Sequence, residues 1–249
     1  MSDRQRIEVY GVTLQCELVG GGRTELVFLH EGLGSIELWK TFPAAVADAV
    51  GRRGLVYDRR GHGRSDPAGA IRTVHYLHDA ADEELDAVLA AFGIDQPVLI
   101  GHSDGATIAL IHATRRPVRG LVLIAPHVYV ESAATEGIER TDRSADALIG
   151  RLERYHDHAR ELYTAWRDIW LAADFADWNI EADIAGLSVP MLLVQGTDDE
   201  YGTLDQLDRI EAAANGRCER LVVKGAGHSP HLTHADDVTE AVARFIGSL

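Results

Sequence analysis

The chain has 249 residues, 46% of them hydrophobic, and a formal net charge of -15. This length fits one large α/β domain with enough apolar material for a sizeable core. Nucleic acid and anionic lipid surfaces bind basic patches, and no run of lysine or arginine interrupts the acidic balance, so we expect neither as a partner.

The sequence also indicates where the protein works. Its two cysteines, Cys16 and Cys218, lie far apart and outside any CxxC or Cys/His spacing, which argues against a disulfide framework or a zinc site and favours a reducing cytoplasm. The opening stretch MSDRQRIEVYGVTLQCELVG alternates polar and apolar residues and does not resemble a signal peptide. No apolar stretch approaches the roughly 20 residues of a membrane-spanning helix. We therefore expect a cytoplasmic protein.

The first predicted elements are two strands. IEVYG and VTLQCELVG, followed by the turn GGGR, are typical of an antiparallel hairpin at a sheet edge. Beyond them, the apolar strands ELVFLH, GLVYD, PVLIGH and RGLVLIAP alternate with helices expected over 36–50, 74–92 and 106–114. This alternation predicts a parallel sheet covered by helices on both faces.

From Glu131 to about Gly186 the alternation gives way to a charged, aromatic helical region. It resumes with VPMLLVQG, a helix around 204–214, the strand ERLVVKG and a closing helix over 235–246. We therefore expect one domain over 1–249, with a core of 1–130 and 187–249 and a small helical lid at about 131–186.

Eight large apolar side chains recur at helical spacing in the expected lid. They could line a pocket or pack the lid onto the core, and we expect only about a quarter of them to touch a substrate. They are Tyr155, Leu162, Tyr163, Trp166, Ile169, Trp170, Phe175 and Trp178.

The stretch IGHSDGA places Ser103 between Gly101 and Gly105, where a predicted strand meets a predicted helix. This G-x-S-x-G pattern indicates a strained strand-to-helix turn that presents a serine hydroxyl, with glycines where any side chain would collide with the backbone. The free amides at the start of the following helix would face an anion formed at Ser103. We interpret Ser103 as a nucleophile.

A serine nucleophile needs a base, and the base needs an acid to orient it. His228 follows a strand in VVKGAGHSPH, and QGTDDEYG supplies an acidic cluster after the strand VPMLLV, so the chain order is Ser, Asp, His. The carboxyl ends of parallel strands meet at one edge of a sheet, so these residues can converge there.

Five motifs in order then resemble those of α/β-hydrolase-fold serine hydrolases over almost the whole chain: HEGLGS, YDRRGHGRSD, GHSDG, GTDDEYG and GAGHSPH. The resemblance implies a mostly parallel eight-stranded sheet, an active site without metal or organic cofactor, and a small-molecule substrate. It makes Ser103 the nucleophile, His228 the general base and Asp199 its acid. Asp199 stands three positions after Gly196, as in the family, while Asp198 and Glu200 are the other candidates.

The resemblance also implies an oxyanion hole made by the backbone amides of Asp104 and Gly32, with Leu33 as the alternative to Gly32. The family commonly has glycine where Glu31 stands. Carboxylates on Glu31 and Asp104 near a negative intermediate would disfavour it unless both point away.

Further histidines and arginines allow other interpretations. His231 and His234 have a spacing that could suit a metal, but no second ligand cluster accompanies them, so we expect none. RRGHGRSD could bind an anion, and we favour a structural turn.

The leading functional hypothesis is hydrolysis of a small carboxylic ester through an acyl-enzyme. The same three residues could also serve a lactonase, a thioesterase, a carbon-carbon bond hydrolase, or a small-ligand receptor without turnover. Carbon-carbon hydrolases of this fold usually have a tryptophan directly after the catalytic histidine, whereas Ser229 follows His228 here, which argues against that activity.

Overall fold

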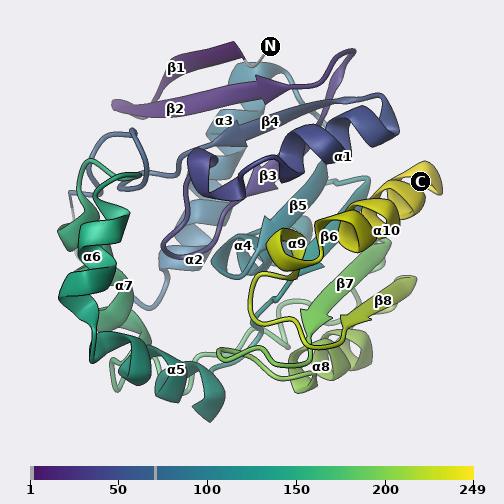
Figure 1. Cartoon of the computed structure of the whole chain (residues 1–249). Coiled ribbons are helices and arrows are strands. Elements are labelled where there is room, and N and C mark those ends of the chain that lie inside the picture. The colour runs from purple at the N-terminus through teal and green to yellow at the C-terminus, as the bar shows by residue number, and fades with distance from the viewer. Residues whose placement is uncertain (1–2, 70–71) are drawn as a thin grey trace.

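The structure, a computed structural model, describes residues 3–69 and 72–249. Its centre is an eight-stranded sheet in the order β1-β2-β4-β3-β5-β6-β7-β8 (Figure 1). The strands are β1 (Asp3–Val9), β2 (Val12–Val19), β3 (Thr24–Leu29), β4 (Arg53–Tyr57), β5 (Val98–His102), β6 (Gly120–Ile124), β7 (Met191–Gly196) and β8 (Cys218–Val223). β1 and β2 form the predicted antiparallel hairpin at one edge, β2 pairs antiparallel with β4, and all further pairs are parallel. The predicted mostly parallel sheet is confirmed.

Helices cover both faces of the sheet, which explains why every residue of β5, β6 and β7 is buried. Successive side chains of a strand point to opposite faces. In β5, Ile100 shares a core with α1 (Phe42–Val50) and α10 (Ala235–Gly247), while its neighbour Leu99 shares the other core with α3 (Leu85–Phe92), α4 (Asp104–Ala113) and α8 (Asp205–Ala213). The sheet therefore separates two apolar layers.

The expected helix over 36–50 is wrong as one continuous element. The structure has a 3-10 turn, η1 (Ile36–Trp39), then a break, then α1. Lys40 takes a positive φ of 55°, which no helix accommodates, and Pro43 in the first turn of α1 lacks the N–H that a continuing helix would need. The break separates η1 from α1.

The expected helix over 74–92 forms with a wider turn inside it. α2 (Tyr76–Asp79) passes into one π-helical turn, η2 (Ala80–Glu84), and then into α3. The ring nitrogen Nδ1 of the buried His112 lies 3.0 Å from the carbonyl oxygen of Ala81 within that turn. A side chain inserted at a helical carbonyl is a common cause of such an irregularity.

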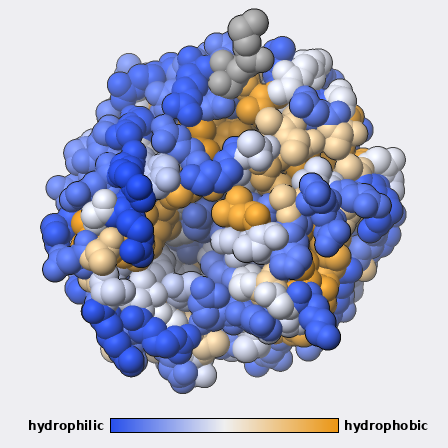
Figure 2. Space-filling view, viewed as in Figure 1, coloured by the Kyte–Doolittle hydropathy of each residue, from blue (hydrophilic) through white to orange (hydrophobic). Residues whose placement is uncertain are grey.

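Between β6 and β7 lie α5 (Ser132–Asp142), α6 (Ala145–Leu152) and α7 (Ala159–Trp170), which form an arc at one side of the sheet (Figure 1). A short helix, α9 (Pro230–Thr233), precedes α10. Hydrophilic residues dominate the face in Figure 2, with apolar residues showing between them. Within residues 3–69 and 72–249, no helix has the length and apolar character to cross a membrane.

Candidate active site

Ser103 occupies a tight turn between β5 and α4 and has the backbone angles φ 54° and ψ -119°. A non-glycine residue with positive φ is strained and persists only where the surrounding structure fixes it. A Cβ on Gly105 would overlap the backbone carbonyl of Leu29, and a Cβ on Gly101 would overlap the backbone of Gly105 and Ala106. Close packing of the turn against β3 thus requires glycine at 105, and the close approach of β5 to the start of α4 requires glycine at 101.

His228 and Asp199 come together as a pair. Nδ1 of His228 lies 2.9 Å from both carboxylate oxygens of Asp199, whose side chain is only 1% exposed. Asp198 instead accepts from the Thr197 hydroxyl at 2.8 Å, and the Glu200 carboxylate accepts from the backbone N–H of His228 at 3.2 Å. Among the three acidic residues, Asp199 therefore has the geometry to orient the imidazole.

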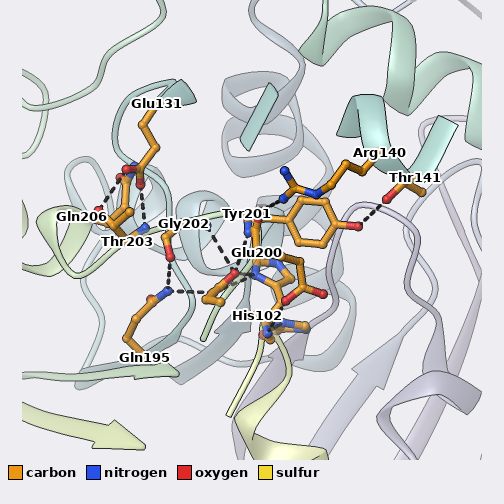
Figure 3. A network of polar contacts seen from close by, with 12 residues as sticks. His102, Glu131, Arg140, Thr141, Gln195, Glu200, Tyr201, Gly202, Thr203 and Gln206 are labelled. Atoms are coloured by element: carbon orange, nitrogen blue, oxygen red, sulfur yellow. Dashed lines mark hydrogen bonds and ion pairs between the residues drawn. The ribbon is translucent and has the colours of Figure 1, made fainter. Parts of the chain in front are cut away.

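Further donors hold the Asp199 carboxylate, and they belong to Gln195, Tyr201 and Gly202, which Figure 3 labels. Gln195 Nε2 donates to Oδ2 at 2.7 Å, and the backbone amides of Tyr201 and Gly202 donate to Oδ1 at 2.8 and 3.2 Å. Burial raises the pKa of Asp199, but the neighbouring His228 and the hydrogen bond from the Tyr201 amide outweigh burial and lower the pKa overall. Asp199 is thus kept as an anion facing His228.

The pKa of His228 responds to the same pair. Burial opposes the charged imidazolium, but the negative charges of Asp199, Glu200 and Glu31 outweigh burial and raise the pKa above its usual value. The ring of the nearby His127 shows the opposite result, since burial and the charge of His228 lower its pKa to about 3. At neutral pH His127 is therefore uncharged.

Ser103 and His228 line one cavity of about 200 Å³. Its other walls come from the loop after β3, from α5, α6 and α7, and from Asp104, His127 and Tyr201. Their surface is mainly apolar and includes Leu33, Ala134, Ile138, Leu148, Trp166 and Trp170. Within the described residues, Ser103 Oγ and the His228 ring form no hydrogen bond with each other. The two residues are therefore related by the cavity that they share.

The backbone of residues 31–33 is fixed by its carbonyl groups. Arg59 Nη2 donates to the carbonyl of Glu31 at 2.9 Å, and Nε2 of His62 lies 3.2 Å from the carbonyl of Gly32. Nε2 of His156 lies 3.1 Å from the carbonyl of Leu33. In the described part of the chain, the amides of Gly32, Leu33 and Asp104 donate to no protein acceptor, so this observation does not separate Gly32 from its alternative Leu33.

The carboxylates of Glu31 and Asp104 take different directions. Oε2 of Glu31 lies 3.3 Å from Nδ1 of His102, in the space left by the missing side chain of Gly34. Asp104 lines the cavity, and its Oδ2 accepts from the Tyr76 hydroxyl at 3.1 Å. The carboxylate of Glu31 is therefore turned toward an imidazole, whereas that of Asp104 stays beside the cavity.

Several residues that shape the site were not predicted from the sequence. Gln195 had one available signal, since it is a polar residue near the carboxyl end of an otherwise apolar strand. His156 and Tyr76 had none, because each reaches the site only through tertiary contacts. His127 lies in the cavity wall with its Nδ1 buried and without a partner among the described residues.

The remaining sequence interpretations concern packing. Of the eight large side chains expected in the lid, Trp166 and Trp170 line the cavity of Ser103. The ring of His231 packs against the rings of Trp39 and Phe42, with centroids 5.0 and 5.2 Å apart. Arg59 and His62 of RRGHGRSD are buried and hydrogen-bonded to backbone, as a structural turn requires.

Comparison with known proteins gives relatives of several activities. The chain is 31% identical over 263 residues to polyketide synthase ThaQ of Burkholderia thailandensis, covering 93% of this chain but 12% of that protein. It is 26% identical over 258 residues to serine hydrolase BPHL of Mus musculus, covering 97% of this chain and 85% of that one.

Solved structures agree on the fold. The enol-lactonase from Burkholderia xenovorans LB400 superposes with a TM-score of 0.76 at 18% identity, covering 98% of this chain and 100% of that chain. The model of the alpha/beta hydrolase family matches residues 26–241. With this match and the eight-stranded sheet described above, the chain belongs to the alpha/beta hydrolase family.

Proposed function

We propose that this protein is a serine hydrolase that cleaves small carboxylic esters through an acyl-enzyme. Ser103 is the nucleophile, His228 the general base and Asp199 the acid that orients it. The observation that carries the proposal is the shared cavity: Ser103 on its strained turn and the Asp199-bound His228 ring line the same space of about 200 Å³.

The reaction follows from these positions. With Nδ1–H of His228 donated to Asp199, Nε2 is free to take the Ser103 proton as Oγ attacks the ester carbonyl. The developing oxyanion receives hydrogen bonds from the amides of Gly32 and Asp104, and each such donor is worth about 2.7 to 4 kcal/mol of barrier in comparable enzymes. His228 returns the proton to the departing alcohol, and a water activated in the same way releases the acid.

The size and lining of the cavity support a small substrate. Its walls are mainly apolar and its volume of about 200 Å³ falls below the usual range of drug-sized pockets. Helices α5, α6 and α7 contribute six of the wall residues, namely Ala134, Ile138, Thr141, Leu148, Trp166 and Trp170. We regard the segment 131–186 as a lid on a single domain. The reaction requires no metal or organic cofactor.

A fluorophosphonate reagent and p-nitrophenyl acetate test the proposal. Wild type should react with one fluorophosphonate per chain and should hydrolyse p-nitrophenyl acetate over many turnovers. The control Ser132→Ala, which changes an exposed serine at the start of α5, should behave in the same way, while Ser103→Ala should neither react with the reagent nor hydrolyse the ester. Labelling that survives in Ser103→Ala would overturn the assignment. A single stoichiometric burst would indicate a receptor without turnover. Panels of lactones, thioesters and carbon-carbon substrates would distinguish an esterase from a lactonase, a thioesterase or a carbon-carbon bond hydrolase.

A further inference from the structure

Glu31 places a carboxylate on the loop that also carries the proposed oxyanion donor Gly32. Glu31 lines the same cavity as Ser103. A free negative charge on this loop would oppose formation of an oxyanion, because charges repel strongly in a site shielded from water. The hydrolase proposed above therefore needs a device that neutralises Glu31.

The Glu31 carboxylate contacts the ring of His102, the last residue of β5 and the neighbour of Ser103. Nδ1 of His102 lies 3.3 Å from Glu31 Oε2, and its Nε2 lies 2.8 Å from the backbone carbonyl of His228. The ring is 1% exposed, so water does not compete for these contacts.

Both partners of the His102 ring are acceptors. An ionised carboxylate and a backbone carbonyl offer lone pairs and no hydrogen, while a neutral imidazole donates from only one of its two nitrogens. Both contacts can be hydrogen bonds only if both ring nitrogens carry hydrogen. The ring is then an imidazolium, with its positive charge beside the Glu31 anion.

The other groups packed around the ring are compatible with this state. The rings of Trp39, His228 and His231 surround it, with centroids 6.2, 5.0 and 4.6 Å away. Burial, followed by the charge of His102, lowers the pKa of His231, which stays neutral and does not compete for Glu31. Burial alone would raise the pKa of Glu31, and the contact with His102 lowers it well below its usual value.

We propose that Glu31 and His102 form a buried ion pair that cancels the carboxylate charge beside the oxyanion site and ties three segments together: the loop after β3, the turn of Ser103 and the backbone of His228. Both are positioning residues, acting through Gly32 and His228. The ion pair stands on geometry alone, while its effect on rate rests on the hydrolase function proposed above.

Nitrogen-proton NMR of the histidine rings tests the pair without any assay of activity. In wild type at about pH 7, the His102 ring should show two protonated nitrogens, whereas Glu31→Gln should show one, because the charge that favours the imidazolium is gone. The matched control Glu37→Gln changes a carboxylate that contacts Arg4, and in this variant the His102 ring should keep two protonated nitrogens. The absence of the His102 signals in His102→Gln assigns them. A wild-type ring with a single protonated nitrogen would overturn the proposal.

Kinetics on p-nitrophenyl acetate test the effect on rate. His102→Gln leaves Glu31 charged without a counter-ion and should lower kcat by about tenfold or more, with KM little changed. Adding Glu31→Gln removes that charge and should restore most of kcat, a rescue that a merely structural role would not give. No rescue would refute the charge role. If His102→Gln does not fold, the spectra of wild type and Glu31→Gln decide, and inactivity of wild type itself would count against the hydrolase function and not the pair.

Discussion

The Nδ1 atom of His228 lies 2.9 Å from both carboxylate oxygens of Asp199, and Gln195 and two backbone amides hold that carboxylate in place. An acceptor with no hydrogen of its own at this position fixes the proton of neutral His228 on Nδ1. Nε2 is then left as the atom that can accept a proton from Ser103. The tautomer of the base therefore depends on the charge and not merely the shape of residue 199.

Asp199→Asn should lower kcat for p-nitrophenyl acetate by about 10⁴-fold with little change in KM. The side-chain amide of asparagine can turn its NH₂ toward Nδ1, which stabilises the tautomer with hydrogen on Nε2, and that tautomer cannot take the serine proton. Asp198→Asn, an exposed neighbour, should keep kcat within about twofold. Equal losses in the two variants would show that Asp199 has no special part.

The pH dependence of kcat/KM should report the environment of His228. Protonated His228 cannot accept the Ser103 proton, so the rate falls as pH drops through its pKa. Because nearby carboxylates raise that pKa, the midpoint should lie above about 6.5. A rate that stays flat from about pH 5 to 8 would contradict the role of His228 as base.

Glu200→Gln should move this acid limb to lower pH by on the order of half a unit. Glu200 accepts from the backbone N–H of His228, and its negative charge is one of the groups that raise the pKa of His228. Glutamine keeps an acceptor but removes the charge. Glu240→Gln, on the exposed side of α10, should leave the midpoint unchanged, and a shift in the opposite direction would refute the electrostatic explanation.

The succession of apolar strands and helical segments along the chain was enough to predict the sheet, its hairpin edge and most helices. Strands that are buried on both faces appear in the sequence as continuous apolar runs. The elements that differed depend on distant partners. The π-helical turn over 80–84 forms around His112, and no periodicity within 74–92 reveals that contact. The break at Lys40 had a signal in the sequence, because Pro43 lies inside the expected helix over 36–50 and proline disfavours a helical residue before it.

The candidate site shows the same division. Ser103 and its glycines could be identified locally, because a turn between strand and helix imposes a fixed spacing. The direction of the Glu31 side chain could not, since its partner His102 lies 71 residues away in the chain. The direction of the Asp104 side chain could not be predicted either, because the Tyr76 hydroxyl that donates to it comes from α2.

Gly105→Ala should lower the free energy of unfolding by about 1–3 kcal/mol or more, measured by urea denaturation. The added methyl group would overlap the backbone carbonyls of Leu29 and His30, which belong to β3 and the loop after it and have no rotamer to change. Gly150→Ala is the matched control. Gly150 lies in α6, and no atom beyond its chain neighbours and its own helix backbone lies within 4 Å of the added carbon, so alanine should stabilise the protein by about 0.5–1 kcal/mol. Equal effects at the two positions would refute the close-packing argument for the turn.

Asp104→Asn should raise kcat for an uncharged ester by about tenfold. Oδ2 of Asp104 lies 3.1 Å from the position that a Cβ of Gly32 would occupy, so its charge stands beside the proposed oxyanion donors. Two charges about 4 Å apart interact by about 1 kcal/mol in water and about 4 kcal/mol at an effective dielectric constant of 20, which is enough to oppose the transition state.

Asparagine at this position keeps an oxygen that can accept from the Tyr76 hydroxyl, and the backbone amide of residue 104 is unchanged. The comparison variant Tyr76→Phe removes that donor and leaves the carboxylate less stabilised, so it should lower kcat where Asp104→Asn raises it. Single-turnover rates with p-nitrophenyl acetate separate acylation from release and measure both effects on the step that forms the oxyanion. A fall in the acylation rate of Asp104→Asn would mean that the carboxylate assists the reaction, because the charge argument allows only a rise.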